Sequence, residues 1–392
     1  MDVVPGTLSN TFQKFVESEK SGGLLLILCT IVSLWITNSS DGTDYLRMWN
    51  TQVGGLTLQH WINDALMAIF FLLIGLELER ELYSGELSNI RNALLPIVAA
   101  IGGIVAPALI HFGLNAGTPT QAGIGIPTAT DIAFALGVLA LLGNRIPSSL
   151  KVFIVAFAVI DDLSAIVIIA AFYTAHLSVG YLAGALGVWA LLFAMNRLFR
   201  IVTLLPYLLG GVVMWFLMLK SGVHTTVTGV MLAFAIPFSI KVDDQESPSH
   251  KLERFLHKPV AFMILPIFAL ANTAVSVSTD WLHELGSANS VGIIAGLIVG
   301  KPLGIVFFSF VAVWGGMCRL PFDLTWSHVV GAGFLGGLGF TMSIFITNLA
   351  FSGNLETINA SRMAILLGSL AAGVVGFIWL ALLSKSEATA AA

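Results

Sequence analysis

Two adjacent aspartates, Asp161 and Asp162, stand in the middle of a long apolar run. This run, residues 152–173, holds 22 residues and no other charge. A helix needs about 20 residues to cross a bilayer, so the run is long enough to span one. Each charged side chain at the centre of such a helix costs roughly 2.5–3.5 kcal/mol on insertion scales. The pair can be kept only where it faces other protein or water, so handling of ions or protons is the first functional hypothesis.

The composition is that of a membrane protein. The chain is 57% hydrophobic and 10% charged, with a mean hydropathy of +0.91, whereas soluble domains are about 25% charged. The net charge of −4 comes without a basic cluster, which argues against a nucleic-acid partner. Cys29 and Cys318 lie in or beside apolar segments and indicate no disulfide framework and no metal site. The first apolar run starts at Gly22, after Lys14 and Lys20, and lacks a small-residue cleavage site, so we interpret it as an uncleaved span.

Apolar runs recur along the chain and predict an all-α integral membrane protein with about 12 transmembrane helices. The expected spans are residues 22–38, 61–77, 94–114, 122–143, 152–173, 180–195, 204–219, 222–239, 259–277, 290–314, 328–350 and 361–384.

The basic residues predict the orientation of these spans. If the N-terminus is cytoplasmic, every Lys and Arg falls in a cytoplasmic segment except Arg47, Lys220, Arg362 and the intramembrane Lys301. Cytoplasmic loops are enriched in Lys and Arg, so both termini are predicted to be cytoplasmic. The loops are short, the longest cytoplasmic one being 240–258, and residues 1–392 are expected to form a single membrane domain.

Two spans carry residues that interrupt a helix. Residues 125–131 contain Pro127, which removes a backbone donor, and residues 331–341 are rich in glycine. These spans are the middle ones of two three-span blocks, 94–173 and 290–384. By the loop count the blocks start from opposite membrane faces, so they are predicted to be inverted repeats whose interrupted helices cross in mid-membrane. Paired interruptions of this kind indicate a transporter site.

Few charges lie deep within the predicted spans. The acids are Asp64, Asp131, Asp161 and Asp162, and the only deep base is Lys301, with Arg362 nearer the end of its span. Adjacent residues of a helix point in different directions, so one aspartate of the pair can face an ion while the other faces a partner. We expect Lys301 to pair with Asp161, where it is either part of the site's chemistry or a structural counter-ion. Asp64 is equally compatible with simple helix packing.

Hard oxygen ligands for a small cation are expected at the first interruption. Thr130 and Asp131 stand there, together with backbone carbonyls that the broken helix sets free. In the loop before the second span, Gly54-Gly55 between β-prone residues is a hairpin signal. The stretch 52–59 is therefore either a hairpin that contacts a second copy of the chain or an ordinary loop. His224 and His257 are candidates for pH sensing, although a lone histidine is more often packed or solvated.

Several segments resemble the NhaA family of bacterial sodium/proton antiporters, and together they reach from about residue 20 to 384. The matching segments are 61–68, 76–77, 129–143, 160–163, 219–224, 300–304 and 339–345.

The resemblance implies the fold, the site and the activity. It implies a core sub-bundle, 94–173 plus 290–384, beside an interface sub-bundle, 22–77 plus 180–277, that forms a homodimer. Asp162 is then the main ligand of a transient Na⁺, Asp161 handles protons with Lys301, and Thr130 and Asp131 lie at the helix crossing. A cluster that adjusts activity to pH is also implied, at Glu77, Arg80, Glu81, Glu253 and His257.

The implied activity is electrogenic exchange of Na⁺ or Li⁺ for protons across the bacterial inner membrane, by alternating access. A carboxylate buried away from water can hold a proton or a cation but not both, so the two compete for Asp161 and Asp162. No enzymatic activity and no cofactor are implied. Two residues depart from the best-known pattern, Glu79 where a basic residue is usual and Arg254 where a histidine is usual, which predicts a shifted pH response.

Two other classes of protein remain compatible with paired intramembrane acids. A cation channel would show flux without counter-flux of protons. An intramembrane aspartyl protease typically carries a Gly-x-Gly-Asp stretch, which this sequence lacks. A transporter of an organic solute is the nearest rival among transporters.

Overall fold

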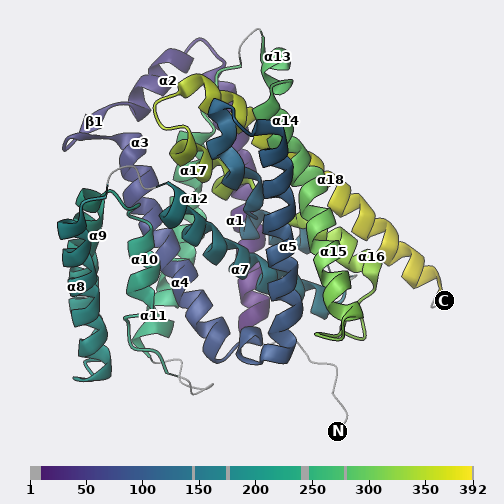
Figure 1. The fold of residues 1–392 in the computed structure, drawn as a ribbon, viewed down its shortest axis with the longest axis horizontal. Coiled ribbons are helices and arrows are strands. Elements are labelled where there is room, and N and C mark those ends of the chain that lie inside the picture. Colours follow the sequence, from purple (N-terminus) through teal and green to yellow (C-terminus); the bar gives the residue numbers. More distant parts are fainter. Residues whose placement is uncertain (1–9, 144–145, 174–176, 240–246, 278–279, 391–392) are drawn as a thin grey trace.

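Helices make up almost all of the regular structure. The computed structural model describes residues 10–143, 146–173, 177–239, 247–277 and 280–390 (Figure 1). The elements are α1 (Asn10–Thr37), α2 (Gly42–Trp49), β1 (Gln52–Val53), β2 (Leu56–Thr57), α3 (Leu58–Trp61), η1 (Ile62–Leu66), α4 (Met67–Tyr83), η2 (Glu86–Ser88), α5 (Ile90–Asn115), η3 (Pro119–Thr128), α6 (Ile132–Leu142), α7 (Ser148–Phe172), α8 (Val179–Arg197), α9 (Leu205–Ser221), α10 (Val227–Ala233), α11 (Pro248–Pro259), η5 (Val260–Ile264), α12 (Leu265–Asn272), α13 (Trp281–Leu285), α14 (Ala288–Ala295), η6 (Gly296–Gly300), α15 (Lys301–Trp314), α16 (Trp326–Gly336), α17 (Phe340–Ala350) and α18 (Leu355–Ala390).

The helices are long and apolar enough for a multi-pass membrane protein. In the described part of the chain, eight helical stretches pass this test, and two pairs of helices pass it across a bend. The shorter α9 is also apolar. The all-α membrane class is therefore confirmed, while the count of 12 spans stays a prediction. In the predicted span 222–239 the regular helix is only the seven-residue α10.

Both predicted interruptions are present. The 3₁₀ segment η3 ends at Thr128, extended backbone follows, and α6 begins only after Asp131. The second break separates α16 from α17, which are bent by 45°. Its glycines allow backbone contacts that a side chain would prevent, because a Cβ on Gly337 would lie 2.3 Å from the Leu297 carbonyl oxygen.

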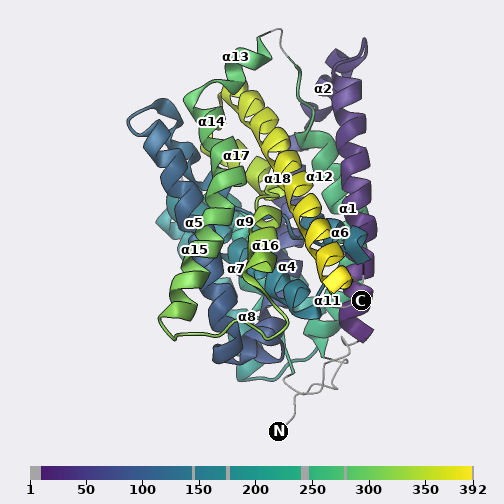
Figure 2. The same cartoon turned by 90° about the vertical axis from the view of Figure 1, so that its right-hand side faces the viewer.

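The first helices of the two predicted repeats, α5 and α15, pack along each other (Figure 2). They meet at Gly102 and Gly304, where a Cβ on Gly102 would lie 2.2 Å from the Gly304 carbonyl oxygen. Small residues of this kind let two membrane helices approach backbone to backbone. The contact brings together the segments 94–173 and 290–384, while their inverted symmetry stays a prediction.

Other helices of the bundle also pack in pairs. α8 lies along α9 and α10 lies along α4, whereas α1 packs against both α6 and α12 and so touches both predicted sub-bundles. The start of α1, the last turns of α18 and α11 lie at the same end of the bundle (Figure 2). The division into core and interface sub-bundles stays a prediction.

The expected loop 240–258 is largely helical in its described part. Residues 240–246 lie outside the described residues, but Pro248–Pro259 forms α11, which continues through η5 into α12. The helix starts early because the Ser247 hydroxyl accepts a hydrogen bond from the His250 amide and Pro248 occupies the first position. The span expected from residue 259 therefore begins about three turns earlier.

The predicted hairpin forms at β1 and β2. Gln52 pairs with Thr57 and Val53 pairs with Leu56 across a two-residue turn. Both turn glycines have positive φ, +62° at Gly54 and +88° at Gly55, as a turn of this kind requires. Its role in a homodimer stays a prediction.

Candidate functional site

The two helix interruptions hold each other in the interior of the bundle. The Asp131 amide donates to the Leu338 carbonyl, and the Thr130 hydroxyl donates to the Gly336 carbonyl over 2.8 Å. A third contact runs from the Ser343 hydroxyl to the Ile126 carbonyl, over 2.6 Å. The backbone groups freed by each break thus find partners at the other break, which satisfies them in a membrane interior without water.

Asp131 joins the two breaks through its side chain. One carboxylate oxygen accepts from the Phe134 amide over 3.2 Å and so caps the start of α6. The other accepts from Thr341, over 3.1 Å from the amide and 2.6 Å from the hydroxyl. Thr341 was included in the glycine-rich stretch but not identified as a site residue. The hydroxyl residue directly after that break is the signal that could have identified it.

Lys301 is fully buried and lies against Asp161, as expected. Its ammonium nitrogen is 2.6 Å from Asp161 Oδ2 and 2.9 Å from the Thr130 hydroxyl. The π-helical segment η6 directly precedes Lys301 and Pro302 follows it, so the helix is locally widened where the lysine leaves it. The pair ties α7 to α15 and to the first interruption.

Asp162 lines a cavity whose lining does not include Lys301. The cavity has a volume of about 30 Å³ and is also lined by Thr130, Asp131 and Thr341. Asp162 is 1% exposed, and its Oδ1 has no hydrogen-bond partner among the described residues. A buried carboxylate oxygen without a partner is costly, so this atom is available to a proton or a cation. Carboxylate and hydroxyl oxygens are the ligands that hard cations prefer.

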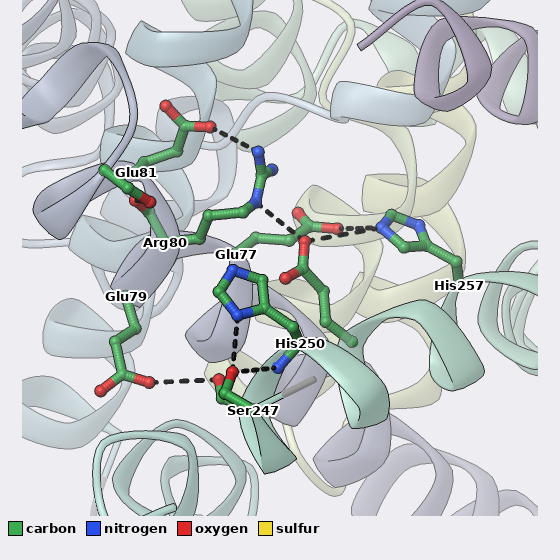
Figure 3. A network of polar contacts seen from close by, with 10 residues as sticks. Glu77, Glu79, Arg80, Glu81, Ser247, His250 and His257 are labelled. Carbon is green, nitrogen blue, oxygen red and sulfur yellow. Dashed lines mark hydrogen bonds and ion pairs between the residues drawn. The ribbon is translucent and has the colours of Figure 1, made fainter. Parts of the chain in front are cut away.

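The cavity also reaches a cluster of charged residues between α4 and α11. Glu77 and His257 line it, and they lie 3.3 Å apart between Oε1 and Nε2. Arg80 bridges Glu253 at 2.9 Å and Glu81 at 3.2 Å. Figure 3 shows Glu77, Arg80 and His257 pointing toward one another. The structure therefore brings together the five residues implied as a pH-responsive cluster.

Glu79 makes a separate contact with α11. It is 2% exposed, and its Oε2 accepts a long hydrogen bond of 3.4 Å from the Ser249 hydroxyl. Ser249, Glu253 and His257 are spaced four residues apart, so they form one stripe along α11 that faces α4. Sequence reasoning noted Glu79 as a departure from the family pattern but did not place it on this seam.

His224 lies apart from the α4–α11 cluster. Its Nε2 is 3.4 Å from Asp64 Oδ1 and its Nδ1 is 2.8 Å from the Thr226 hydroxyl. The ring meets Phe345 edge-on, with centroids 5.1 Å apart. Asp64, which was compatible with packing alone, thus contacts this histidine through its side chain.

No group of three or more His, Cys, Asp or Glu side chains with the geometry of a metal site occurs among the described residues. The oxygen atoms around Asp162 suit a cation that binds briefly, as a transported substrate does. The chemistry that this arrangement supports is exchange of a proton and a small cation at one carboxylate.

Known proteins resemble this chain over nearly its full length. The family model described as Na+/H+ antiporter 1 matches residues 13–380. The Na(+)/H(+) antiporter NhaA of Dechloromonas aromatica is 67% identical over 380 residues, which cover 97% of this chain and 98% of that protein. The protein of the same name from Cytophaga hutchinsonii is 58% identical over 379 residues, covering 96% and 97%. The one from Helicobacter acinonychis is 44% identical over 425 residues, also covering 96% and 97%. The chain belongs to the NhaA family of Na⁺/H⁺ antiporters.

Proposed function

We propose that this protein exchanges Na⁺ or Li⁺ for protons across the bacterial inner membrane, with Asp162 as the carboxylate for which the two compete. The observation that carries the proposal is that Asp162 lines a cavity together with other oxygen-bearing side chains, while its buried Oδ1 has no hydrogen-bond partner among the described residues. Membership of the family and the names of the relatives support the same exchange.

Competition follows from the burial of the site. A charged carboxylate that is cut off from water must be neutralised, and either a proton or a monovalent cation does this. With the site open to the cytoplasm, Na⁺ displaces the proton of Asp162. After the core moves and the site opens outward, protons displace Na⁺. Thr130, Asp131 and Thr341 supply further oxygen atoms, which favour small, hard cations over K⁺.

Electrogenic exchange would come from the Asp161–Lys301 pair. A cation bound beside Asp161 competes with the Lys301 ammonium for the same carboxylate. If Lys301 then releases its proton, two protons cross for each Na⁺ and one net charge moves inward. The membrane potential is worth about 2.3 kcal/mol per charge at 100 mV and would help to drive Na⁺ out.

The α4–α11 cluster would adjust this exchange to pH. Glu77 and His257 belong both to the cluster and to the lining of the Asp162 cavity. A change in the charge of His257 alters its attraction to Glu77, and so the packing of α11 against α4. This end of the bundle carries the start of α1 and the last turns of α18, and we assign it to the cytoplasm, as the distribution of basic residues predicts. The β1–β2 hairpin at the opposite end is the proposed contact of a homodimer.

The test is proton flux in liposomes that contain the purified protein and a pH dye. With an acid interior, external Na⁺ or Li⁺ should cause rapid alkalinisation of the interior, while K⁺ and choline should not. Asp162→Asn should abolish the response, and the control Glu356→Gln, at an exposed acid of α18, should keep it. Exchange at the wild-type rate in Asp162→Asn would refute the site, and cation flux without proton flux would indicate a channel.

A further inference from the structure

Three fully buried aromatic rings lie beside the Asp162 cavity. Phe345 is 5.9 Å from Phe71 and 6.4 Å from Phe268 between ring centroids. All three have 0% exposure. Phe71 follows a lining residue of α4, Phe70, and Phe268 lies one turn after a lining residue of α12, Leu265. The rings therefore form an apolar layer between three helices, α4, α12 and α17, that each contribute residues to the lining of the cavity.

The helices α12 and α17 each carry an asparagine about one turn beyond their buried ring. On α12, Asn272 follows Phe268 by four residues, and on α17, Asn348 follows Phe345 by three. Residues three or four apart share one face of a helix. α12 and α17 thus present the same sequence of features in the same order, from the cavity to a ring and then to an amide.

The amides meet Arg362 of α18 in one connected cluster. Arg362 Nη2 donates to Asn348 Oδ1 over 2.7 Å and to Asn272 Oδ1 over 3.3 Å. The Asn348 amide nitrogen also donates to Asn272 Oδ1, over 2.7 Å. Asn63 of η1 and Gln59 of α3 complete the cluster through Asn272, over 2.9 and 3.4 Å. The contacts tie α12, α17 and α18 to the segment that follows the β1–β2 hairpin.

An arginine is uncommon at a position that is buried and has no acidic partner, as Arg362 is among the described residues. It is 6% exposed, its Nε has no hydrogen-bond partner among the described residues, and none of their acids lies within ion-pair distance of it. The nearby Asp64 is the partner of His224. A buried charge normally has a carboxylate partner, and without one it is costly. Neutral amide oxygens hold the guanidinium in place, but less tightly than a carboxylate would.

We propose that Arg362, Asn272 and Asn348 form the latch that closes the transport pathway at the end opposite the α4–α11 cluster. While the latch is made, the amides and the aromatic layer beneath them separate the Asp162 cavity from the outside. Opening requires Arg362 and Asn348, both in the predicted core sub-bundle, to leave Asn272 in the interface sub-bundle. The neutral amide partners make this separation reversible. The inference rests on the proposed function for its direction, since it assigns this end to the external face.

The latch can be tested by labelling a single cysteine in the cavity. The background has Cys29→Ser and Cys318→Ser, and the reporter is Leu265→Cys on α12. A membrane-impermeant, positively charged methanethiosulfonate is added to right-side-out or to inverted vesicles in separate samples. The labelling rate reports the opening of each face and needs no transport.

Two substitutions should shift external labelling in opposite directions. Arg362→Gln removes the charge and should raise the external rate by on the order of tenfold, which is the effect of losing a hydrogen bond to a charged group. Asn272→Asp places a carboxylate where Asn272 Oδ1 accepts from both Arg362 and Asn348, so it should strengthen the contact and lower the same rate by a similar factor. Arg362→Lys keeps the charge but not the planar group and should fall between wild type and Arg362→Gln.

Opposite shifts separate a latch from general damage, because a loosened fold would raise labelling in every variant. No change in external labelling, or the same direction of change in Arg362→Gln and Asn272→Asp, would overturn the inference. The same substitutions made in an Asp162→Asn background distinguish a failure of the latch from a failure of the proposed function. If the labelling shifts persist there without antiport, the latch stands by itself. If wild type shows no antiport but the shifts remain, only the function is wrong.

Discussion

Lys301 and Asp161 form a fully buried ion pair, with 2.6 Å between the ammonium nitrogen and Oδ2. The lysine begins α15 and the aspartate lies in the middle of α7, 140 residues away in the sequence. The same ammonium contacts Thr130 at the break before α6, so one charge connects three helices at the site. The pair is therefore both a structural tie and a part of the proposed proton pathway.

Removing Lys301 should have two effects that can be measured independently, one on the stability of the fold and one on the charge moved during exchange. Lys301→Gln leaves Asp161 buried without a cation, and breaking a buried pair in this way costs about 3–5 kcal/mol. We expect a clearly lower melting temperature in detergent, with Asp161→Asn/Lys301→Gln recovering part of the loss because no buried charge is then left unpaired. If exchange persists in the double variant, it should no longer generate a membrane potential. Unchanged electrogenicity in Lys301→Gln would exclude the lysine from the proton pathway.

The hydroxyl of Thr341 should hold Asp131 in place for cation binding. Thr341→Val keeps the shape but removes the 2.6 Å hydrogen bond, at a net cost of about 1 kcal/mol. We expect the apparent KM for Na⁺ to rise by about fivefold, measured by the liposome assay. Thr347→Val is the matched control, since that buried hydroxyl of α17 donates only to its own helix, at the Ser343 carbonyl. Equal effects of the two substitutions would argue against a specific role.

His257 should transmit pH to the cavity through Glu77. The attraction across their 3.3 Å contact is present when the imidazole carries a proton and is lost as the pH rises and the proton leaves. His257→Gln should therefore behave at low pH as wild type does at high pH, and His257→Lys should keep the low-pH behaviour as the pH rises. The measurement is exchange rate against pH, with His60→Gln as a control at an exposed histidine. Profiles that coincide with wild type in both variants would remove His257 from the pH response.

The contact between α5 and α15 should tolerate no side chain. A Cβ on Gly304 would lie 2.0 Å from the Gly102 carbonyl oxygen, so Gly304→Ala forces the helices apart. Overpacking of this kind typically costs about 1–3 kcal/mol. Gly113→Ala on α5 is the control, because a Cβ there meets nothing within 4 Å. We expect only Gly304→Ala to lower the melting temperature, and similar values for both variants would contradict the close contact.

Much of the site could be predicted because membranes penalise charge and broken backbone. Asp161, Asp162 and Lys301 stand out in an apolar sequence, and pairing them required only that a buried ammonium have an anion nearby. Pro127 and the glycines before Phe340 predicted the interruptions for an equally local reason. The Gly54-Gly55 turn followed from backbone conformations that other residues rarely adopt.

Contacts between distant segments could not be predicted in this way. Nothing local to Thr341 shows that its hydroxyl meets Asp131, and nothing near Asp64 shows that His224 is its partner. α11 was expected to be a loop because its charged residues resemble a solvated segment, but those charges pair with α4 across the fold. Arg362 was noted as an exception among the basic residues and as a charge near the end of a span. Nothing local to it shows that its amide partners are Asn272 of α12 and Asn348 of α17.

The sequence by itself determined that the chain spans a membrane, where its helices break and which few charges lie inside, because each of these depends on local composition and the cost of polar groups in lipid. Only the tertiary structure decided which oxygen atoms surround Asp162, that Thr130 also contacts Lys301, and that Arg362 is held by amides and by no acid among the described residues. Those depend on how helices far apart in the chain pack, and packing selects partners by shape and distance, which no local pattern records.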